Sequence, residues 1–166
     1  LFVGGNETTT FALTSGMWLL GRDPDLQATL RAEPSRIPQF IDECLRVESP
    51  TQGLWRSIAQ DTEFHGVTIP AGAAIHIRYG AANRDPERFG CPHEVQVDRA
   101  NSGRHLAFAA GVHRCPGQWL SILEQKIAYE AIFERFAGFR CSERNTFEHI
   151  PGFVLRSLQE LWVDVD

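Results

Sequence analysis

The sequence lacks any run of about twenty apolar residues, and it carries no signal peptide. Its four cysteines, at positions 44, 91, 115 and 141, do not form a regular framework. We therefore expect neither a membrane-spanning segment nor a disulfide framework in these residues. These absences fit a reducing, cytoplasmic location.

The sequence also lacks a large excess of charge of one sign, since its formal net charge is only −5. A weakly acidic chain argues against a nucleic-acid or anionic-membrane partner. With 43% apolar and 22% charged residues, the composition is that of a globular protein. No repeat, low-complexity tract or linker divides residues 1–166, so we expect one domain. The chain begins at Leu1 inside an apolar helical stretch, without methionine, and we therefore expect a segment of a longer protein.

A zinc-site spacing is missing as well. The triplets 91–93 and 113–115 supply two cysteines and two histidines. Zinc sites usually space cysteines as C-x₂₋₄-C and histidines as H-x₃₋₅-H, and neither spacing occurs here. The sequence therefore does not favour zinc.

The most informative stretch that is present runs from Phe108 to Gly117 and reads F-x-x-G-x-H-x-C-x-G. Because proline favours the first helical position, Pro116 predicts that Cys115 lies just before a helix. The positive end of the helix dipole favours a thiolate there. The glycines Gly111 and Gly117 allow close backbone approach. Taken alone, the stretch also fits a buried structural cysteine before a helix.

This stretch resembles the proximal haem-binding loop of the cytochrome P-450 family. The resemblance implies that Cys115 is the axial thiolate ligand of haem b, iron protoporphyrin IX. Phe108, Gly111 and Gly117 would then line the haem, and His113 would touch a propionate.

A second constellation, residues 4–10, reads Gly-Gly-Asn-Glu-Thr-Thr-Thr and opens a predicted helix that ends near Gly21. Glycines and threonines are costly in a helix, and threonine can bond back to a carbonyl one turn earlier. We therefore expect a locally opened helix. A close-packed Gly-Gly contact with a solvated glutamate is the alternative.

These residues resemble the G-G-x-E/D-T stretch of the family's long distal helix. The resemblance places Gly4 and Gly5 against the haem. It implies that Thr8 hydrogen-bonds bound dioxygen and that Glu7 helps to deliver protons.

A third element, Glu43-Cys44-Leu45-Arg46, lies on a predicted amphipathic helix. Glu43 and Arg46 are three residues apart and share a face, which by itself is typical of a surface ion pair. In the family this E-x-x-R pair is completed by a later arginine. The resemblance makes Arg99 the third member of a structural triad that holds the cysteine loop.

The remaining chain alternates short strands with turns, and residues 61–72 and 74–77 predict a hairpin and a strand. Arg56 matches the family's propionate-binding arginine, and its guanidinium suits a carboxylate. Residues 118–136 predict one long helix. By resemblance Leu54, Trp55 and Phe153 border an apolar substrate.

Together these features predict a mainly α fold with small β-sheets, the C-terminal part of a cytochrome P-450 domain. The implied activity is monooxygenation of an apolar small molecule with O₂, using electrons from a ferredoxin or similar donor. A peroxide-driven haem-thiolate enzyme and a truncated, non-catalytic haem-binding fragment remain alternatives. The chain departs from the family pattern at Ala109, where glycine is frequent, and at Ser121, where alanine is common.

Overall fold

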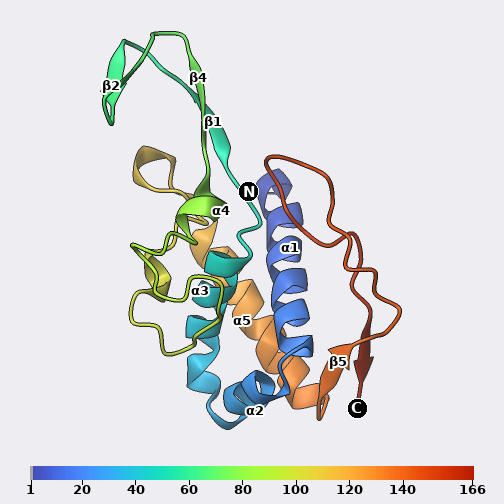
Figure 1. Cartoon of the computed structure of the whole chain (residues 1–166). Helices are drawn as coiled ribbons and strands as arrows, with labels where there is room; N and C mark the ends of the chain where they lie inside the picture. Colours follow the sequence, from blue (N-terminus) through green and yellow to red (C-terminus); the bar gives the residue numbers. More distant parts are fainter. Residues whose placement is uncertain (1) are drawn as a thin grey trace.

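The computed structural model describes residues 2–166, and it has a helical body with a β arm projecting from one end (Figure 1). The helices are α1 (Phe2–Gly21), α2 (Pro24–Ala32), α3 (Ile37–Val47), α4 (Tyr79–Ala82) and α5 (Gln118–Arg135). The short 3₁₀ turns are η1 (Pro34–Arg36), η2 (Ser102–Arg104) and η3 (Gly111–His113). The mainly α class with small sheets is confirmed.

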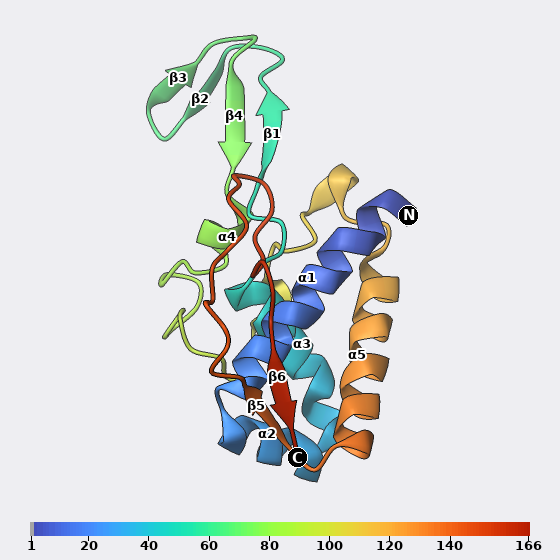
Figure 2. The same cartoon turned by 90° about the vertical axis from the view of Figure 1, so that its right-hand side faces the viewer.

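Three two-stranded antiparallel sheets complete the fold. β1 (Leu54–Ser57) pairs with β4 (Ala74–Ile77), and the intervening chain forms the hairpin of β2 (Thr62–Phe64) and β3 (Val67–Ile69). These four strands make up the arm. β5 (Phe139–Cys141) pairs with β6 (Val163–Val165) at the opposite end of the body (Figure 2). The sequence therefore predicted the hairpin and the β4 strand correctly.

The core lies where α1, α3 and α5 meet, and its members are apolar apart from the Cys44 thiol and the Tyr129 hydroxyl. The α3 helix is central, because eight of its eleven residues are buried. Helices α1 and α5 approach closely at Gly16, where any side chain would collide with the Tyr129 hydroxyl. The buried core comprises Ala12, Leu20, Leu30, Ile37, Phe40, Ile41, Cys44, Leu45, Tyr129 and Phe139.

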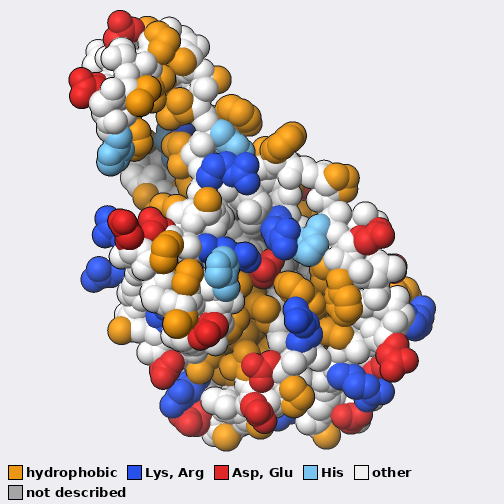
Figure 3. All heavy atoms as spheres, in the orientation of Figure 1, with side chains coloured by type: hydrophobic (Ala, Val, Ile, Leu, Met, Phe, Trp, Pro, Cys, Tyr) orange, Lys and Arg blue, Asp and Glu red, His pale blue; other side chains and the backbone are white. Residues whose placement is uncertain are grey.

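Local signals explain where the helices begin. The Asp23 carboxylate caps α2 by accepting a hydrogen bond from the Leu26 amide at 2.9 Å, and Pro24 opens that helix. The α1 helix runs without a break from Phe2 to Gly21, so the predicted local opening is wrong. Across residues 2–166, no helix is both long and apolar enough to cross a membrane. Acidic and basic side chains are interspersed on the body in the face that Figure 3 shows.

A buried ion-pair cluster fixes the loop of residues 84–101 to α3. The Glu43 carboxylate is fully buried and accepts hydrogen bonds from Arg46 at 2.7 and 3.0 Å and from Arg99 at 3.0 Å. The Gln96 amide donates to the same carboxylate at 2.9 Å. Burial raises the pKa of Glu43, but these hydrogen bonds outweigh burial and hold it below its ordinary value.

The two arginines also satisfy the carbonyl groups of that loop, which has no regular structure. Arg46 donates to the loop carbonyls of Pro92 and Glu94 at 2.7 and 2.8 Å, and to that of Asn83, just before the loop, at 3.0 Å. Arg99 donates to the carbonyl of Gly90 at 2.6 Å. The loop therefore takes its shape from side chains anchored on one carboxylate.

We expect Glu43→Gln to lower the free energy of unfolding by about 3–5 kcal/mol, because it leaves two arginines without their buried counter-charge. The matched control is Glu33→Gln, which breaks the exposed Glu33–Arg36 pair of the same i,i+3 spacing. That control should cost less than about 1 kcal/mol. Urea denaturation measures both, and equal losses would contradict a structural role for the buried cluster.

Candidate functional site

The cysteine loop, residues 106–117, connects the anchored loop to α5. The side-chain amide of the fully buried Asn83 ties its start in place, accepting from the Leu106 amide at 2.6 Å and donating to the Ser49 hydroxyl at 2.8 Å. Farther along, the Cys115 amide donates to the Phe108 carbonyl at 2.9 Å. The loop is therefore closed on itself as well as held to the helical body.

Two residues of this loop adopt left-handed backbone conformations. Gly111 has φ 65°, and Ala109 has φ 56°. Residues other than glycine rarely adopt such φ angles. This explains why the family pattern often has glycine at the position of Ala109. Hydrogen bonds of the loop hold Ala109 in this conformation. One of them is donated by the Ala109 amide to the Leu106 carbonyl at 2.9 Å.

Helix α5 runs from Gln118 to Arg135, so the predicted range 118–136 is confirmed, and Pro116 lies before the first helical residue instead of opening the helix. Residues 115–118 form a turn, in which the Gln118 amide approaches the Cys115 carbonyl at 3.4 Å, and Gly117 is the N-cap residue. Proline is tolerated in such a turn as readily as in a first helical turn, so the pattern could not separate the two. Cys115 nevertheless lies at the amino-terminal end of α5.

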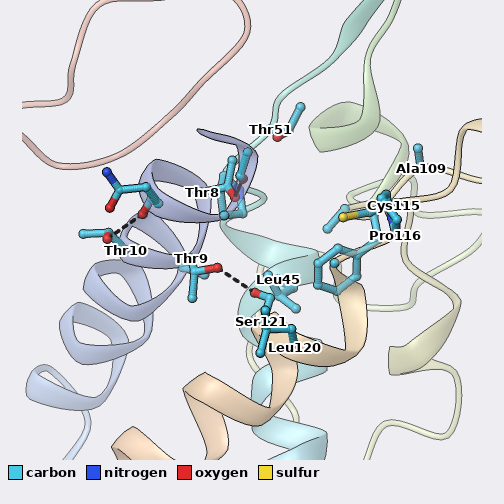
Figure 4. Close-up of a pocket in the computed structure, with 18 of the residues that line it drawn as sticks. Thr8, Thr9, Thr10, Leu45, Thr51, Ala109, Cys115, Pro116, Leu120 and Ser121 are labelled. Atoms are coloured by element: carbon cyan, nitrogen blue, oxygen red, sulfur yellow. Dashed lines mark hydrogen bonds between the residues drawn. The ribbon is translucent and has the colours of Figure 1, made fainter. Parts of the chain in front are cut away.

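The cysteine faces an open pocket of about 880 Å³ between α1 and the cysteine loop. Figure 4 shows the Cys115 sulfur on one side of this pocket and Thr8, carried by α1, on the other. Of the four cysteines, all of which lie among the described residues, Cys115 is the one that lines this pocket. Cys44, in contrast, lies in the core, where burial raises the pKa of its thiol.

The α1 side of the pocket is left open at its two glycines. A Cβ atom added at Gly4 or Gly5 would meet no atom within 4 Å. One turn later, the Thr8 hydroxyl donates to the Gly4 carbonyl at 2.7 Å. On this side, therefore, the α1 backbone at Gly4 and Gly5 is exposed to the pocket without side chains, next to the Thr8 hydroxyl.

The structure brings most of the predicted site residues together. Those that line the pocket are Gly4, Gly5, Thr8, Leu54, Phe108, His113, Cys115 and Gly117. Glu43, Arg46 and Arg99 form the buried cluster beneath the loop.

Five predicted residues do not line the pocket: Glu7, Arg56, Gly111, Trp55 and Phe153. Arg56 donates to the neighbouring Trp55 carbonyl at 2.7 Å. The Trp55 ring stacks on His76 with 4.5 Å between ring centroids. Phe153 is 77% exposed.

Some pocket residues carried no role in the sequence interpretation. Thr9 and Ser121 lie on the pocket floor and hydrogen-bond to each other across α1 and α5 at 3.1 Å (Figure 4). Thr51 and Tyr79 line the pocket from loop and helix segments beside the arm. The spacing of Thr9 with Ala12, Gly16 and Leu20 along one helix face was the signal that could have marked Thr9 as buried.

Between residues 2 and 166, no three His, Cys, Asp or Glu side chains come together in a way that could hold a metal ion.

Comparisons with known proteins point to one family. The profile of the cytochrome P450 family matches residues 1–161. Cytochrome P450 144 of Mycobacterium tuberculosis is 34% identical over 161 residues, which are 97% of this chain and 37% of that protein. Substrate-free CYP150A6 of Mycobacterium marinum superimposes with a TM-score of 0.97 at 40% identity, over 100% of this chain and 43% of that one.

A third relative was solved with a ligand. CYP109E1 of Bacillus megaterium, in complex with corticosterone, has a TM-score of 0.93 and 31% identity, covering 98% of this chain and 44% of that one. The chain thus spans less than half the length of each of these three relatives.

We predict that Ala109→Gly raises the free energy of unfolding by roughly 0.5–1 kcal/mol, because it relieves the left-handed strain at this position. The control is Ala110→Gly. Ala110 has an extended backbone with φ −149°, so glycine there only adds freedom to the unfolded chain and should destabilise. Chemical denaturation of both variants gives the signs, and a loss of stability in Ala109→Gly would contradict the strain.

Proposed function

The chain belongs to the cytochrome P450 family, and on that premise we propose that it is the C-terminal part of a haem-thiolate monooxygenase domain. The observation that carries this proposal is the pocket with Cys115 on one side and Thr8 on the other (Figure 4). A thiolate and a hydroxyl facing one space from two separate supports are what a thiolate-ligated oxygenase requires on its two faces.

The residues present fit haem b, which members of the family bind. The pocket has room for a ligand of this size class, and the bare backbone at Gly4 and Gly5 allows a flat ligand to lie close to α1. When bound, thiolate-ligated haem supplies the activation of dioxygen and the insertion of one oxygen atom into a C–H bond.

On the proximal side, we assign Cys115 as the iron ligand and Phe108, Gly111 and Gly117 as the loop that surrounds it. The hydrogen bond from the Cys115 amide to the Phe108 carbonyl holds the sulfur in position, and the anchored loop supports it from behind. His113 and Arg56 are assigned to the propionates. His113 lines the pocket, and a guanidinium suits a carboxylate partner.

On the distal side, we assign proton handling to Thr8 and Glu7. Since the Thr8 hydroxyl already donates to the Gly4 carbonyl, its oxygen is free to accept a hydrogen bond from a group in the pocket. Glu7 is exposed on the same turn, where its carboxylate can exchange protons with water. The two residues would thus connect the pocket with solvent protons.

The proposed substrate is an apolar small molecule. Leu54, Leu45 and Leu13 give the pocket apolar lining, and the Bacillus megaterium relative was solved with a steroid, corticosterone. Trp55 and Phe153 are assigned to the outer border of the substrate site. The proposed electron donor is a ferredoxin or similar protein, which would dock beside the cysteine loop, where Arg114 is exposed.

The test is the absorption spectrum of the haem-loaded protein after reduction and exposure to carbon monoxide. We expect the strongly red-shifted band of a thiolate-ligated haem, and we expect Cys115→Ser to lose it because serine removes the thiolate. Cys91→Ser, at an exposed cysteine outside the pocket, is the matched control and should keep the band.

Loss of the band in both variants, or its survival in Cys115→Ser, would contradict the assignment of the ligand. Haem uptake without the band in the parent would favour a non-catalytic haem-binding fragment. Turnover with peroxide but not with a reduced ferredoxin would favour the peroxide-driven class.

A further inference from the structure

We propose that Thr9 and Ser121 are positioning residues for the proposed oxygenase site. Their hydrogen bond joins α1 to α5 at the pocket floor and so fixes Thr8 relative to Cys115. The proposal rests on the proposed function, and it gives a role to Ser121, one of the two departures from the family pattern.

Three consecutive threonines on α1 use their hydroxyl groups differently. Thr8 and Thr10 donate to carbonyls of their own helix, those of Gly4 and Asn6, each at 2.7 Å. Thr9 instead bonds across to the Ser121 hydroxyl of α5 at 3.1 Å (Figure 4). Thr9 is also buried, with 7% of its surface exposed. Its hydroxyl therefore links two helices, whereas its neighbours' hydroxyls do not.

The position of this bond matters because it lies between the two sides of the pocket. Ser121 is on the first turn of α5, six residues after Cys115, and its amide donates to the Gly117 carbonyl at 3.0 Å. Thr9 follows Thr8 directly. Both Thr9 and Ser121 line the pocket. A shift of α1 along or around α5 at this point would therefore carry Thr8 away from its place opposite the cysteine.

A third buried residue orients the serine. The Gln125 side chain is fully buried, and its amide nitrogen donates to the Ser121 carbonyl at 3.2 Å and to the Ser121 hydroxyl oxygen at 3.3 Å. Buried polar groups are costly when they lose their partners. Removing the Ser121 hydroxyl would leave both the Thr9 hydroxyl and one Gln125 contact unsatisfied.

An apolar pair at these two positions would fill the same space, so the polar chain adds directionality that packing alone does not supply. A hydrogen bond accepts only a narrow range of distance and angle, and this restricts how α1 is rotated. Oxygenation depends on such placement, because small misplacements of a reacting group cost large factors in rate.

The experiment compares Thr9→Val, which keeps the shape but loses the hydroxyl, with Thr9→Ser, which keeps the hydroxyl. Ser121→Ala and the double variant Thr9→Val/Ser121→Ala complete a cycle. The control is Thr29→Val on α2, where a half-buried helical threonine bonds to a carbonyl of its own helix at 2.9 Å. Two properties of the haem-loaded protein are measured: the C–O stretching band of the reduced carbon monoxide complex, and the peroxide released per dioxygen consumed.

We expect Thr9→Val and Ser121→Ala to broaden or split the C–O band and to raise peroxide release at least threefold, without loss of the thiolate band. Thr9→Ser and Thr29→Val should match the parent. The double variant should be no worse than Ser121→Ala alone, because that variant already removes the bond from Thr9.

Thr9→Val indistinguishable from Thr9→Ser, or single effects that simply add in the double variant, would overturn the positioning role while leaving the proposed function intact. A parent protein whose haem shows no thiolate band would overturn the proposed function, and this inference with it.

Discussion

The buried carboxylate of Glu43 is the interaction on which the rest of the site depends. It is fully removed from solvent, and it collects hydrogen bonds from two arginines and one backbone amide. Those arginines then satisfy the carbonyls of a long loop that has no helix or strand to do so. Removing the side chain of one member leaves an uncompensated buried charge, so the stabilisation depends on all three side chains being present.

Two further hydrogen-bonded contacts connect this anchored loop to the cysteine. Asn83, directly before the anchored loop, accepts a hydrogen bond from the amide of Leu106, the first residue of the cysteine loop, and the Phe108 carbonyl accepts one from the Cys115 amide. The opposite side of the pocket is supported independently by α1, which packs on α3 and α5 through the core. Two rigid supports that meet in one core allow a sulfur and a hydroxyl to face each other across an open space.

Much of this arrangement could be predicted from short patterns. The spacing around Cys115, the Gly-Gly-x-Glu-Thr run and the Glu43–Arg46 pair each mark local chemistry. The structure places Cys115, Gly4, Gly5 and Thr8 around one pocket and the Glu43–Arg46 pair in the buried cluster that anchors the preceding loop. Helical periodicity gave the ends of α1 and α5 to within a residue or two. The first turn of α5 was less predictable, since Pro116 fits a turn as well as a helix start.

Side-chain direction could not be read from the sequence. The sequence does not distinguish the three adjacent threonines. In the structure Thr9 is buried against α5, whereas Thr8 and Thr10 donate hydrogen bonds to carbonyls of their own helix. Arg56 and Trp55 also depend on direction, because neighbouring residues on a strand point to opposite faces. Arg56 bonds to a neighbouring carbonyl, and Trp55 stacks on His76. Such choices are made by tertiary packing.

The most direct test of the central claim is iron K-edge X-ray absorption on the haem-loaded protein, which reports the atoms bound to iron. Cys115 as the axial ligand predicts one sulfur in the first coordination shell of the parent and none in Cys115→Ala. A shell of nitrogen and oxygen alone in the parent, or a sulfur that persists in the variant, would contradict the assignment of this pocket as a haem-thiolate site.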